Sequence, residues 1–314
     1  MSINWYPGHM HKATKEIRKI LPSMDVIIEI LDARIPFSSE NPVIAALNSD
    51  KPRIKLLNKA DLADPVVTGL WLNHFHQQKN IKAMAISCTE DSEKLHAIID
   101  LCKKRVPGKG EGINRINALV AGIPNVGKST LINMLAGRVV ARSGNEPAVT
   151  RAQQKINLNN GIMLFDTPGI LWPKIENENS GYRLAVTGAI RNTAISLDDI
   201  GFFAANFLIK NYPDHLAKRY QLEQVPETEL ALLEILGRQR GCLGGGGLVD
   251  LTKIAEIFLT EIRACKLGRL SFETPDLIEK ELQETRLKAE RKAAEKRVQK
   301  EKRKSAFKKK SVQK

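Results

Sequence analysis

The sequence has few cysteines and no long hydrophobic segment. Its four cysteines include no C-x-x-C pair, which excludes a disulfide scaffold and a zinc ribbon and favours reduced thiols. No apolar run approaches the roughly 18 residues that a membrane-spanning helix needs. The first residues, MSINWYPGHMHK, lack the hydrophobic core of a secretory signal. We therefore expect a cytoplasmic protein without a membrane partner.

The remaining composition is that of a folded protein with an uneven charge. The chain has 314 residues, 42% of them hydrophobic, which suits about two domains with hydrophobic cores and excludes complete disorder. The net charge is +14. Residues 279–314 hold 15 Lys and Arg but 6 Asp and Glu, so this C-terminal segment alone carries +9. Such a tail is typical of proteins that bind nucleic acid or an anionic membrane surface.

The first half of the chain alternates short β-branched runs with longer helical patterns. Strands are predicted at Val26–Leu31, Arg53–Leu57, Ala83–Ile86, Ile116–Ala121, Lys155–Leu158 and Ile162–Phe165. Helices are predicted near residues 10–21, 41–48, 65–78, 92–105 and 128–137. This alternation is typical of an α/β fold with a mostly parallel sheet. The Gly- and Lys-rich segment Val106–Asn114 predicts a linker between two halves of that sheet.

After about residue 176 the strand pattern ends. Helices are predicted at Leu184–Ile190, Ile200–Asn211, Glu227–Gly237 and Leu251–Cys265. We therefore expect a first domain over residues 1–175 and a mainly helical domain over residues 176–275. Residues 276–314 form the basic tail. Its few apolar residues do not repeat in heptads, so it is either a single charged helix or disordered until bound.

A phosphate-binding pattern follows the strand at Ile116–Ala121. Gly122–Ser129, GIPNVGKS, fits G-x-x-x-x-G-K-[ST] and opens a predicted helix. In such a loop, backbone N–H groups and the helix N-terminus surround the phosphates. Lys128 would reach the β- and γ-phosphates, and Ser129 would bind Mg²⁺. The predicted nucleotide contacts from this loop are Asn125, Val126, Gly127, Lys128, Ser129 and Thr130.

A second motif, Asp166-Thr167-Pro168-Gly169, follows the strand at Ile162–Phe165. A carboxylate at a strand end can hold the Mg²⁺ shell, and the N–H of Gly169 can bind a γ-phosphate. The tetrapeptide by itself is a common turn. Its position 37 residues after Ser129 suits a sheet strand beside the phosphate loop.

A third motif, Asn58-Lys59-Ala60-Asp61, selects the base. The Asp61 carboxylate can accept from N1–H and N2–H₂ of guanine, whereas adenine would leave it unpaired. Sites of this kind discriminate by roughly 10⁴. The stem of Lys59 would lie along the base, and Asn58 would brace the phosphate loop. A solvated turn explains the tetrapeptide alone, but not its coincidence with the two other motifs.

Two weaker signals suit the same chemistry. Ser87-Cys88-Thr89 follows the next strand and would present a backbone N–H to guanine O6; a buried loop Cys and a capping Ser or Thr explain it equally well. Thr150 lies between the phosphate loop and Asp166, where it would complete the Mg²⁺ shell when γ-phosphate is bound. The alternative is an ordinary loop threonine.

Together these are the five motifs of Ras-like GTPases, in a different order. Asn58–Asp61 and Ser87–Thr89 precede the phosphate loop, Thr150 and Asp166–Gly169. The chain therefore resembles a circularly permuted Ras-like P-loop GTPase, followed by a mainly helical domain and a basic tail. Over about residues 3–275 it closely resembles the ribosome biogenesis GTPase A family. The segments that carry this resemblance are Trp5–Met10, Asp32–Pro36, Gly122–Thr130, Asp166–Pro173 and Leu184–Gly188.

The resemblance also implies catalytic residues. Ras-like enzymes orient the attacking water with a Gln directly after D-x-x-G, where this chain has Ile170. In the family that role belongs to an N-terminal histidine, here His9; the alternative is that Trp5–Met10 is only a turn packing the N-terminus. The predicted catalytic residues are His9, Lys128, Thr150 and Gly169.

One loop residue matches GTPases that use potassium. Asn125 would hold a K⁺ that offsets charge on the transferred phosphoryl group, or else it braces its own loop. One position departs from the family, because its switch usually reads Pro-Gly-x-Thr and this chain has Ala148. If the backbone there needs a positive φ, Ala148 is unfavourable and alters the geometry at Thr150.

The resemblance implies a large ribosomal subunit precursor as partner, with rRNA bound by the helical domain and GTP hydrolysis stimulated by the particle. The tail adds an electrostatic, sequence-independent attraction to RNA. The alternative is an RNA-binding assembly scaffold with structural, barely hydrolysed GTP. A membrane-associated GTPase is disfavoured, because the tail lacks an apolar face and a lipidation motif. The oligomeric state is left open.

Overall fold

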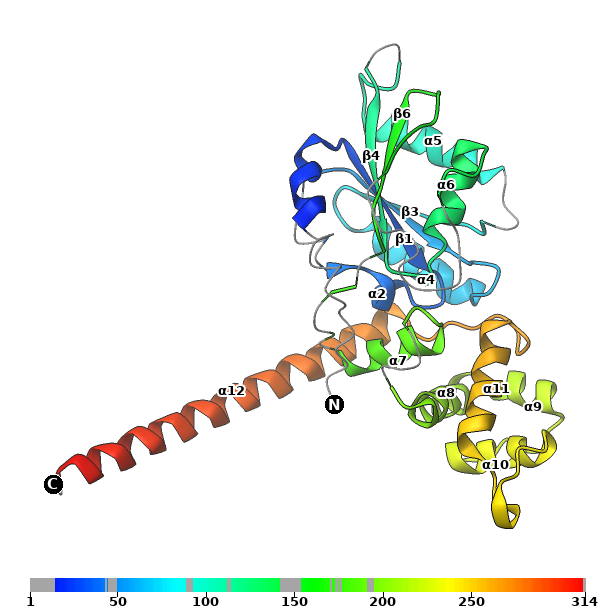
Figure 1. Ribbon diagram of the computed structural model, residues 1–314, viewed down its shortest axis with the longest axis vertical. Helices are drawn as coiled ribbons and strands as arrows, with labels where there is room; N and C mark the ends of the chain where they lie inside the picture. The colour runs from blue at the N-terminus through cyan, green and yellow to red at the C-terminus, as the bar shows by residue number, and fades with distance from the viewer. Residues whose placement is uncertain are drawn as a thin grey trace. The chain divides into compact units, whose positions relative to one another are not determined.

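The computed structural model describes most of the chain (Figure 1). The described residues are 15–42, 44, 50–88, 93–111, 114–141, 154–169, 171–172, 175, 177–190 and 195–312. Along α12 (Pro275–Val312), side chains are described as far as Lys296, with the exception of Ala293.

Within these residues the chain forms a six-stranded sheet with the order β3-β2-β1-β4-β6-β5. The strands are β1 (Val26–Asp32), β2 (Arg53–Asn58), β3 (Ile81–Ala85), β4 (Ile116–Gly122), β5 (Gln154–Asn157) and β6 (Ile162–Asp166). Neighbouring strands are parallel except for β5, which runs antiparallel to β6 at one edge. The prediction of a mostly parallel α/β sheet is confirmed, and each predicted strand is present within two residues of its expected bounds.

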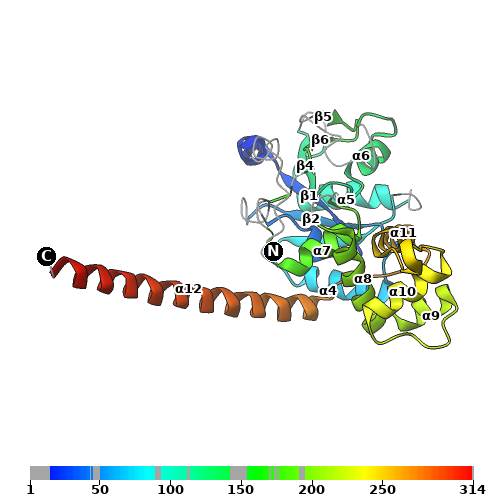
Figure 2. The same cartoon turned by 60° about the horizontal axis from the view of Figure 1, so that its bottom comes forward.

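The central strands are buried because the sheet is covered on both faces. Every residue of β1 and β2 is buried, as their runs of Ile, Leu and Val require. Helices α5 (Lys94–Arg105) and α6 (Lys128–Ala136) lie on one side of the sheet, and the short helix η1 (Leu21–Ser23) lies on the other (Figures 1 and 2). The predictions near 92–105 and 128–137 are therefore confirmed.

Helix α4 (Pro65–His76) begins with strong local signals. Asp64 accepts hydrogen bonds from the N–H groups of Val66 (2.8 Å) and Val67 (3.3 Å), and Pro65 is the first helical residue. This confirms the helix predicted at 65–78. A short helix, α2 (Pro36–Ser39), was not predicted. Of the predicted helix at 10–21 the described residues 15–20 are helical, and most of 41–48 lies outside the described residues.

The part of the chain after the sheet is helical, as predicted. It contains α7 (Glu178–Val186), α8 (Leu197–Asn211), α9 (Pro213–Tyr220), α10 (Glu229–Gln239) and α11 (Leu251–Arg263). The prediction Leu184–Ile190 is wrong in its bounds: Asn177 caps α7 by accepting from Asn179 N–H (3.0 Å), and Gly188 at φ 76° follows its end. Helix α9 was missed, although Pro213 at its first position is a start signal.

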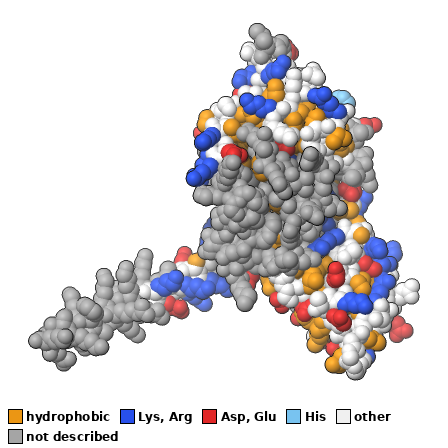
Figure 3. All heavy atoms as spheres, in the orientation of Figure 1, with side chains coloured by type: hydrophobic (Ala, Val, Ile, Leu, Met, Phe, Trp, Pro, Cys, Tyr) orange, Lys and Arg blue, Asp and Glu red, His pale blue; other side chains and the backbone are white. Residues whose placement is uncertain are grey.

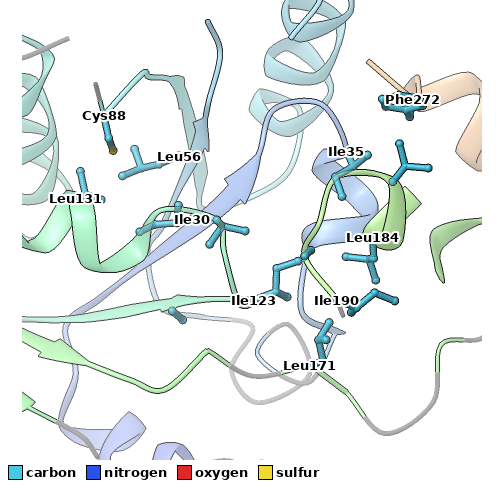
Figure 4. Close-up of a cluster of buried hydrophobic side chains, with 14 of the residues drawn as sticks. Ile30, Ile35, Leu56, Cys88, Ile123, Leu131, Leu171, Leu184, Ile190 and Phe272 are labelled. Atoms are coloured by element: carbon cyan, nitrogen blue, oxygen red, sulfur yellow. The ribbon is translucent and has the colours of Figure 1, made fainter. Parts of the chain in front are cut away.

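The buried cores of the sheet and the helical region are continuous. Figure 4 shows Ile30 and Leu56 of the sheet in one cluster with Ile123 and with Leu184 of α7. Leu171 lies at the lower edge of this cluster, beside Ile190. A short segment after α11 adds polar links: Phe272 N–H donates to Arg34 O (2.8 Å), and the buried Arg183 donates from Nε to Phe272 O (2.9 Å). The end of α7 is thus packed directly against the sheet.

The chain divides into two compact units, residues 1–274 and residues 275–314. The described residues of the second unit form the single helix α12. Whether the tail is helical or disordered before it binds a partner stays a prediction. The boundary expected at residues 175 and 176 lies within the first unit and stays a prediction. Among the described residues, none of the helices combines the length and the apolar character needed to cross a membrane.

Candidate nucleotide-binding site

The predicted nucleotide motifs meet at one edge of the sheet. Because neighbouring strands are parallel, their carboxyl ends lie side by side: Ile30 pairs with Gly122, Asp32 pairs with Asn58, and Val120 pairs with Asp166. The loops that follow these strands therefore face one another. This edge is where parallel α/β sheets bind their ligands.

The loop between β4 and α6 has the backbone of a phosphate-binding loop. Gly127 has φ 93°, and Lys128 is the first residue of α6. A Cβ at Gly127 would lie 2.2 Å from Asn58 Nδ2. Glycine is therefore required here both by the positive φ and by the lack of space for a side chain. The loop thus brings its N–H groups and the positive end of α6 to the same edge.

Asn58 connects the base loop to the phosphate loop. Its Nδ2 donates to Val126 O (2.7 Å), and its Oδ1 accepts from the N–H of Cys88 (3.1 Å). The hydrogen bond to Val126 is the brace expected from the sequence. The N–H of Cys88, one of the groups considered for guanine O6, is directed at Asn58.

Lys128 and Asp166 form a buried ion pair. Lys128 Nζ lies 2.5 Å from Asp166 Oδ1, and the aspartate is 0% exposed. Burial raises the pKa of Asp166, and the charge of Lys128 opposes that rise. Asp166 Oδ2 is buried and has no hydrogen-bond partner within the described part of the chain. An oxygen of this kind fits the oxygen ligands that Mg²⁺ prefers, and Ser129, the residue after Lys128, is half-buried.

Gly169 lies against the phosphate loop. A Cβ at Gly169 would be 3.1 Å from the backbone N and Cα of Pro124. Thr167 fixes the start of this segment, because its hydroxyl donates to Val120 O (2.8 Å). The backbone of the D-x-x-G motif can therefore approach a ligand held by the phosphate loop.

Lys59 and Asn125 tie the two loops together a second time. Lys59 Nζ donates to Asn125 O (2.7 Å) and to Asp32 Oδ2 (3.1 Å). Asn125 Nδ2 donates to Gly188 O (2.9 Å) at the end of α7. Asp32 was not predicted as a site residue, although a charged side chain at the end of a buried strand is a usable signal.

The structure does not place every predicted site residue. Asp61 is half-buried in the loop after β2, and Thr130 is half-buried in the first turn of α6. Ser87 is buried beside Cys88. The predictions for His9, Thr89 and Thr150, as well as Ile170 and Ala148, lie outside the described residues.

Some basic side chains of the helical region are partners of a buried carboxylate. On the face shown in Figure 3, Lys and Arg occur over the sheet region and the helical region rather than in one patch. Arg219 and Arg240 each donate to the buried Glu261, over 2.7 Å and 2.8 Å. Arg219 and Arg240 therefore neutralise a buried carboxylate, which accounts for their positions without an RNA partner.

The fold and the motifs at its carboxyl edge define the class: a P-loop GTPase whose motifs are circularly permuted. Residues 117–223 match a family model described as "50S ribosome-binding GTPase". Ribosome biogenesis GTPase A of Priestia megaterium is 45% identical over 290 residues, covering 90% of this chain and 100% of that protein. The chain belongs to the ribosome biogenesis GTPase A family.

Two solved structures support the same assignment. A GDP-bound YlqF is 29% identical, has a TM-score of 0.60, and covers 83% of this chain and 99% of its own. The GNP-bound YlqF from T. maritima is 29% identical and has a TM-score of 0.58. It covers 84% of this chain and 98% of its own. The predicted fold and the GTPase activity are thereby confirmed at the level of the family.

Proposed function

We propose that this GTPase binds GTP with Mg²⁺ at the carboxyl edge of its sheet and acts on the large ribosomal subunit precursor, which stimulates hydrolysis. The observation that carries the nucleotide site is the hydrogen bond from Asn58 Nδ2 to Val126 O, beside the Lys128–Asp166 pair. It brings the base motif, the phosphate loop and the metal motif to one place. Family membership favours this reading over a scaffold with structural GTP.

Each motif has a defined task in this proposal. Asp61 accepts from N1–H and N2–H₂ of guanine. The N–H groups of the phosphate loop and of Gly169 bind the phosphates, and Lys128 neutralises their charge. Ser129, Asp166 and Thr150 would hold Mg²⁺. When bound, that ion offsets the negative charge of the β- and γ-phosphates.

Two further groups complete the reaction. Because Ile170 cannot hydrogen-bond water, His9 is proposed to orient the attacking water. Asn125 is proposed as a K⁺ ligand: its Nδ2 is held by Gly188 O, so its amide oxygen is the atom that would face the cation. K⁺ would then supply the charge that an arginine finger supplies in other GTPases.

The proposed partner is polyanionic. The matching family model is described as ribosome-binding, and the basic tail carries +9 over residues 279–314. We assign the helical domain, residues 176–275, and the tail, residues 276–314, to rRNA contact in the cytoplasm. Association should therefore weaken as salt concentration rises, because phosphate contacts release counterions.

The proposal is tested by measuring GTP hydrolysis in KCl and in NaCl, with and without purified large ribosomal subunits. We expect slow hydrolysis alone and a rise of about 10²-fold or more with subunits in KCl, as accessory charge stabilisation provides in other GTPases. Equal rates with and without subunits, while GTP remains bound, would support the scaffold instead. Equal rates in the two salts would remove the K⁺ assignment alone.

Substitution of His9 separates catalysis from binding. In His9→Ala we expect the subunit-stimulated rate to fall about 10²-fold, because positioned proton-transfer or water-orienting groups contribute on that scale. GTP affinity should not change. The control is His96→Ala, on the exposed face of α5. An unchanged stimulated rate would remove His9 from the reaction.

A further inference from the structure

Two buried charges lie beside the base loop and outside the nucleotide motifs. Asp32 ends β1, and Arg34 follows in the next turn. Arg34 donates from Nε to Oδ1 (2.9 Å) and from Nη2 to Oδ2 (2.7 Å), and its N–H also donates to Oδ1 (3.1 Å). Both side chains are buried. Removing both charges from water costs free energy that offsets their attraction. A contribution to stability alone therefore does not explain why this ion pair is buried here.

Asp32 has a further partner in the N-K-x-D motif. Its Oδ2 accepts from Lys59 Nζ (3.1 Å), and the same ammonium donates to Asn125 O (2.7 Å). Lys59 has φ 62° and Asn125 has φ 61°, a left-handed conformation that is unfavourable for lysine and tolerated by asparagine. The contacts of the Lys59 ammonium therefore connect two loop residues that both have this conformation.

Arg34 extends this network to helix α7. Its Nη2 donates to Thr187 O (3.4 Å), directly after the helix. Arg263 donates to two carbonyls of the preceding turn, over 2.7 Å and 2.9 Å, and Asn125 Nδ2 donates to Gly188 O (2.9 Å). The end of α7 thus receives hydrogen bonds from α11, from the phosphate loop and from the residue that holds Asp32.

We propose that Asp32 is a positioning residue for guanine-nucleotide binding, and that Arg34 fixes its carboxylate and joins it to the end of α7. Asp32 acts through Lys59: it holds the ammonium between β1 and the phosphate loop, which keeps the base loop and the phosphate loop in their binding arrangement. It does not touch the nucleotide. This inference rests on the nucleotide site proposed above.

The electrostatics of the pair agree with this role. Burial acts to raise the pKa of Asp32, but the charges of Arg34 and Lys59 outweigh it and hold the pKa well below its usual range. Asp32 therefore stays ionised at neutral pH and keeps its attraction for the Lys59 ammonium. A neutral side chain at this position would accept the hydrogen bond without that charge.

A double-mutant cycle on the full chain tests the proposal. Binding of a fluorescent GDP analogue is measured for Asp32→Asn, for Lys59→Met and for the double variant. We expect Asp32→Asn to weaken binding about 10- to 100-fold in the parent chain and less than about 3-fold when Lys59 is already Met, because coupled residues are not additive. Full additivity of the two effects would overturn the proposal, as would unchanged affinity in Asp32→Asn.

Two further variants keep the test independent of folding. Glu261→Gln also removes a buried carboxylate with two arginine partners, but within the helical region, and GDP affinity should be unchanged. If Asp32→Asn does not fold, Asp32→Asn/Arg34→Met removes both buried charges, and the same loss of affinity is expected. Retained affinity in that folded variant overturns the proposal.

Failure of the parent chain to bind GDP would instead contradict the nucleotide site itself.

Discussion

Asp61→Asn should exchange the base preference of this protein from guanine to xanthine. Xanthine keeps N1–H but carries a carbonyl at C2, so an asparagine can accept from N1–H and donate to that carbonyl. With guanine, the same side-chain amide would meet the N2 amine donor to donor. Unmatched polar groups at such a site cost roughly 10⁴ in discrimination, and we expect the ratio of GTP to XTP affinity to change by about that factor.

The measurement is competition of GTP and XTP against a fluorescent GDP or XDP analogue. The parent chain and Asp100→Asn, an exposed aspartate on α5, serve as controls and should prefer GTP equally. Asp61 is half-buried in a loop, so the exchange should leave the free energy of unfolding nearly unchanged. If Asp61→Asn retains its preference for GTP, Asp61 does not read the base.

Lys128→Ala should abolish most of the hydrolytic activity. The ammonium lies at the start of α6, where it would face the charge that develops on the transferred phosphoryl group. Removal of one preorganised charge of this kind costs about 10²- to 10³-fold in rate. We expect a fall of that size in subunit-stimulated turnover, measured under single-turnover conditions. Activity within a few-fold of the parent would exclude the phosphate-binding role of Lys128.

The same substitution should also change stability in a pH-dependent way. Without Lys128 the buried Asp166 loses the charge that opposes the rise of its pKa, so the pKa of the folded state lies further above that of the unfolded state. The folded state then binds the proton more tightly, and its stability falls as pH rises through the folded pKa. We expect a loss of about 3–5 kcal/mol near pH 8 and a smaller loss near pH 4.

Denaturant unfolding without nucleotide at the two pH values measures this difference. The control is Lys109→Ala, because Lys109 forms a 2.8 Å pair with Asp25 while its side chain is 42% exposed. An exposed pair of this kind contributes about 0–1 kcal/mol, so its loss should have a small effect on the free energy of unfolding. An equal effect of both substitutions would contradict the buried environment of Asp166.

The expected fold agrees with the structure because its signals are local. β-Branched runs predict the six strands, and each of the described nucleotide motifs sits directly at the carboxyl end of the strand before it. Each motif is recognised from a few adjacent residues, so the sequence also gives the order of the motifs along the chain. That order indicates the circular permutation. Helix bounds were less accurate: α7 begins at Glu178 because of a cap and a preceding segment that carry no periodic pattern.

The sequence by itself determined the class of the protein and the motifs of its nucleotide site. Only the tertiary structure decided how those motifs are held. The contact from Lys59 to Asn125 spans 66 residues, and the contact from Asn125 to Gly188 spans 63. Such pairs leave no spacing or periodicity in the chain, because they form only when the parallel strands and the end of α7 bring separate loops to one edge of the sheet. The pairing of Asp32 with Arg34 is local, but the contacts from Lys59 to Asp32 and from Arg34 to Thr187 O depend on tertiary structure in the same way.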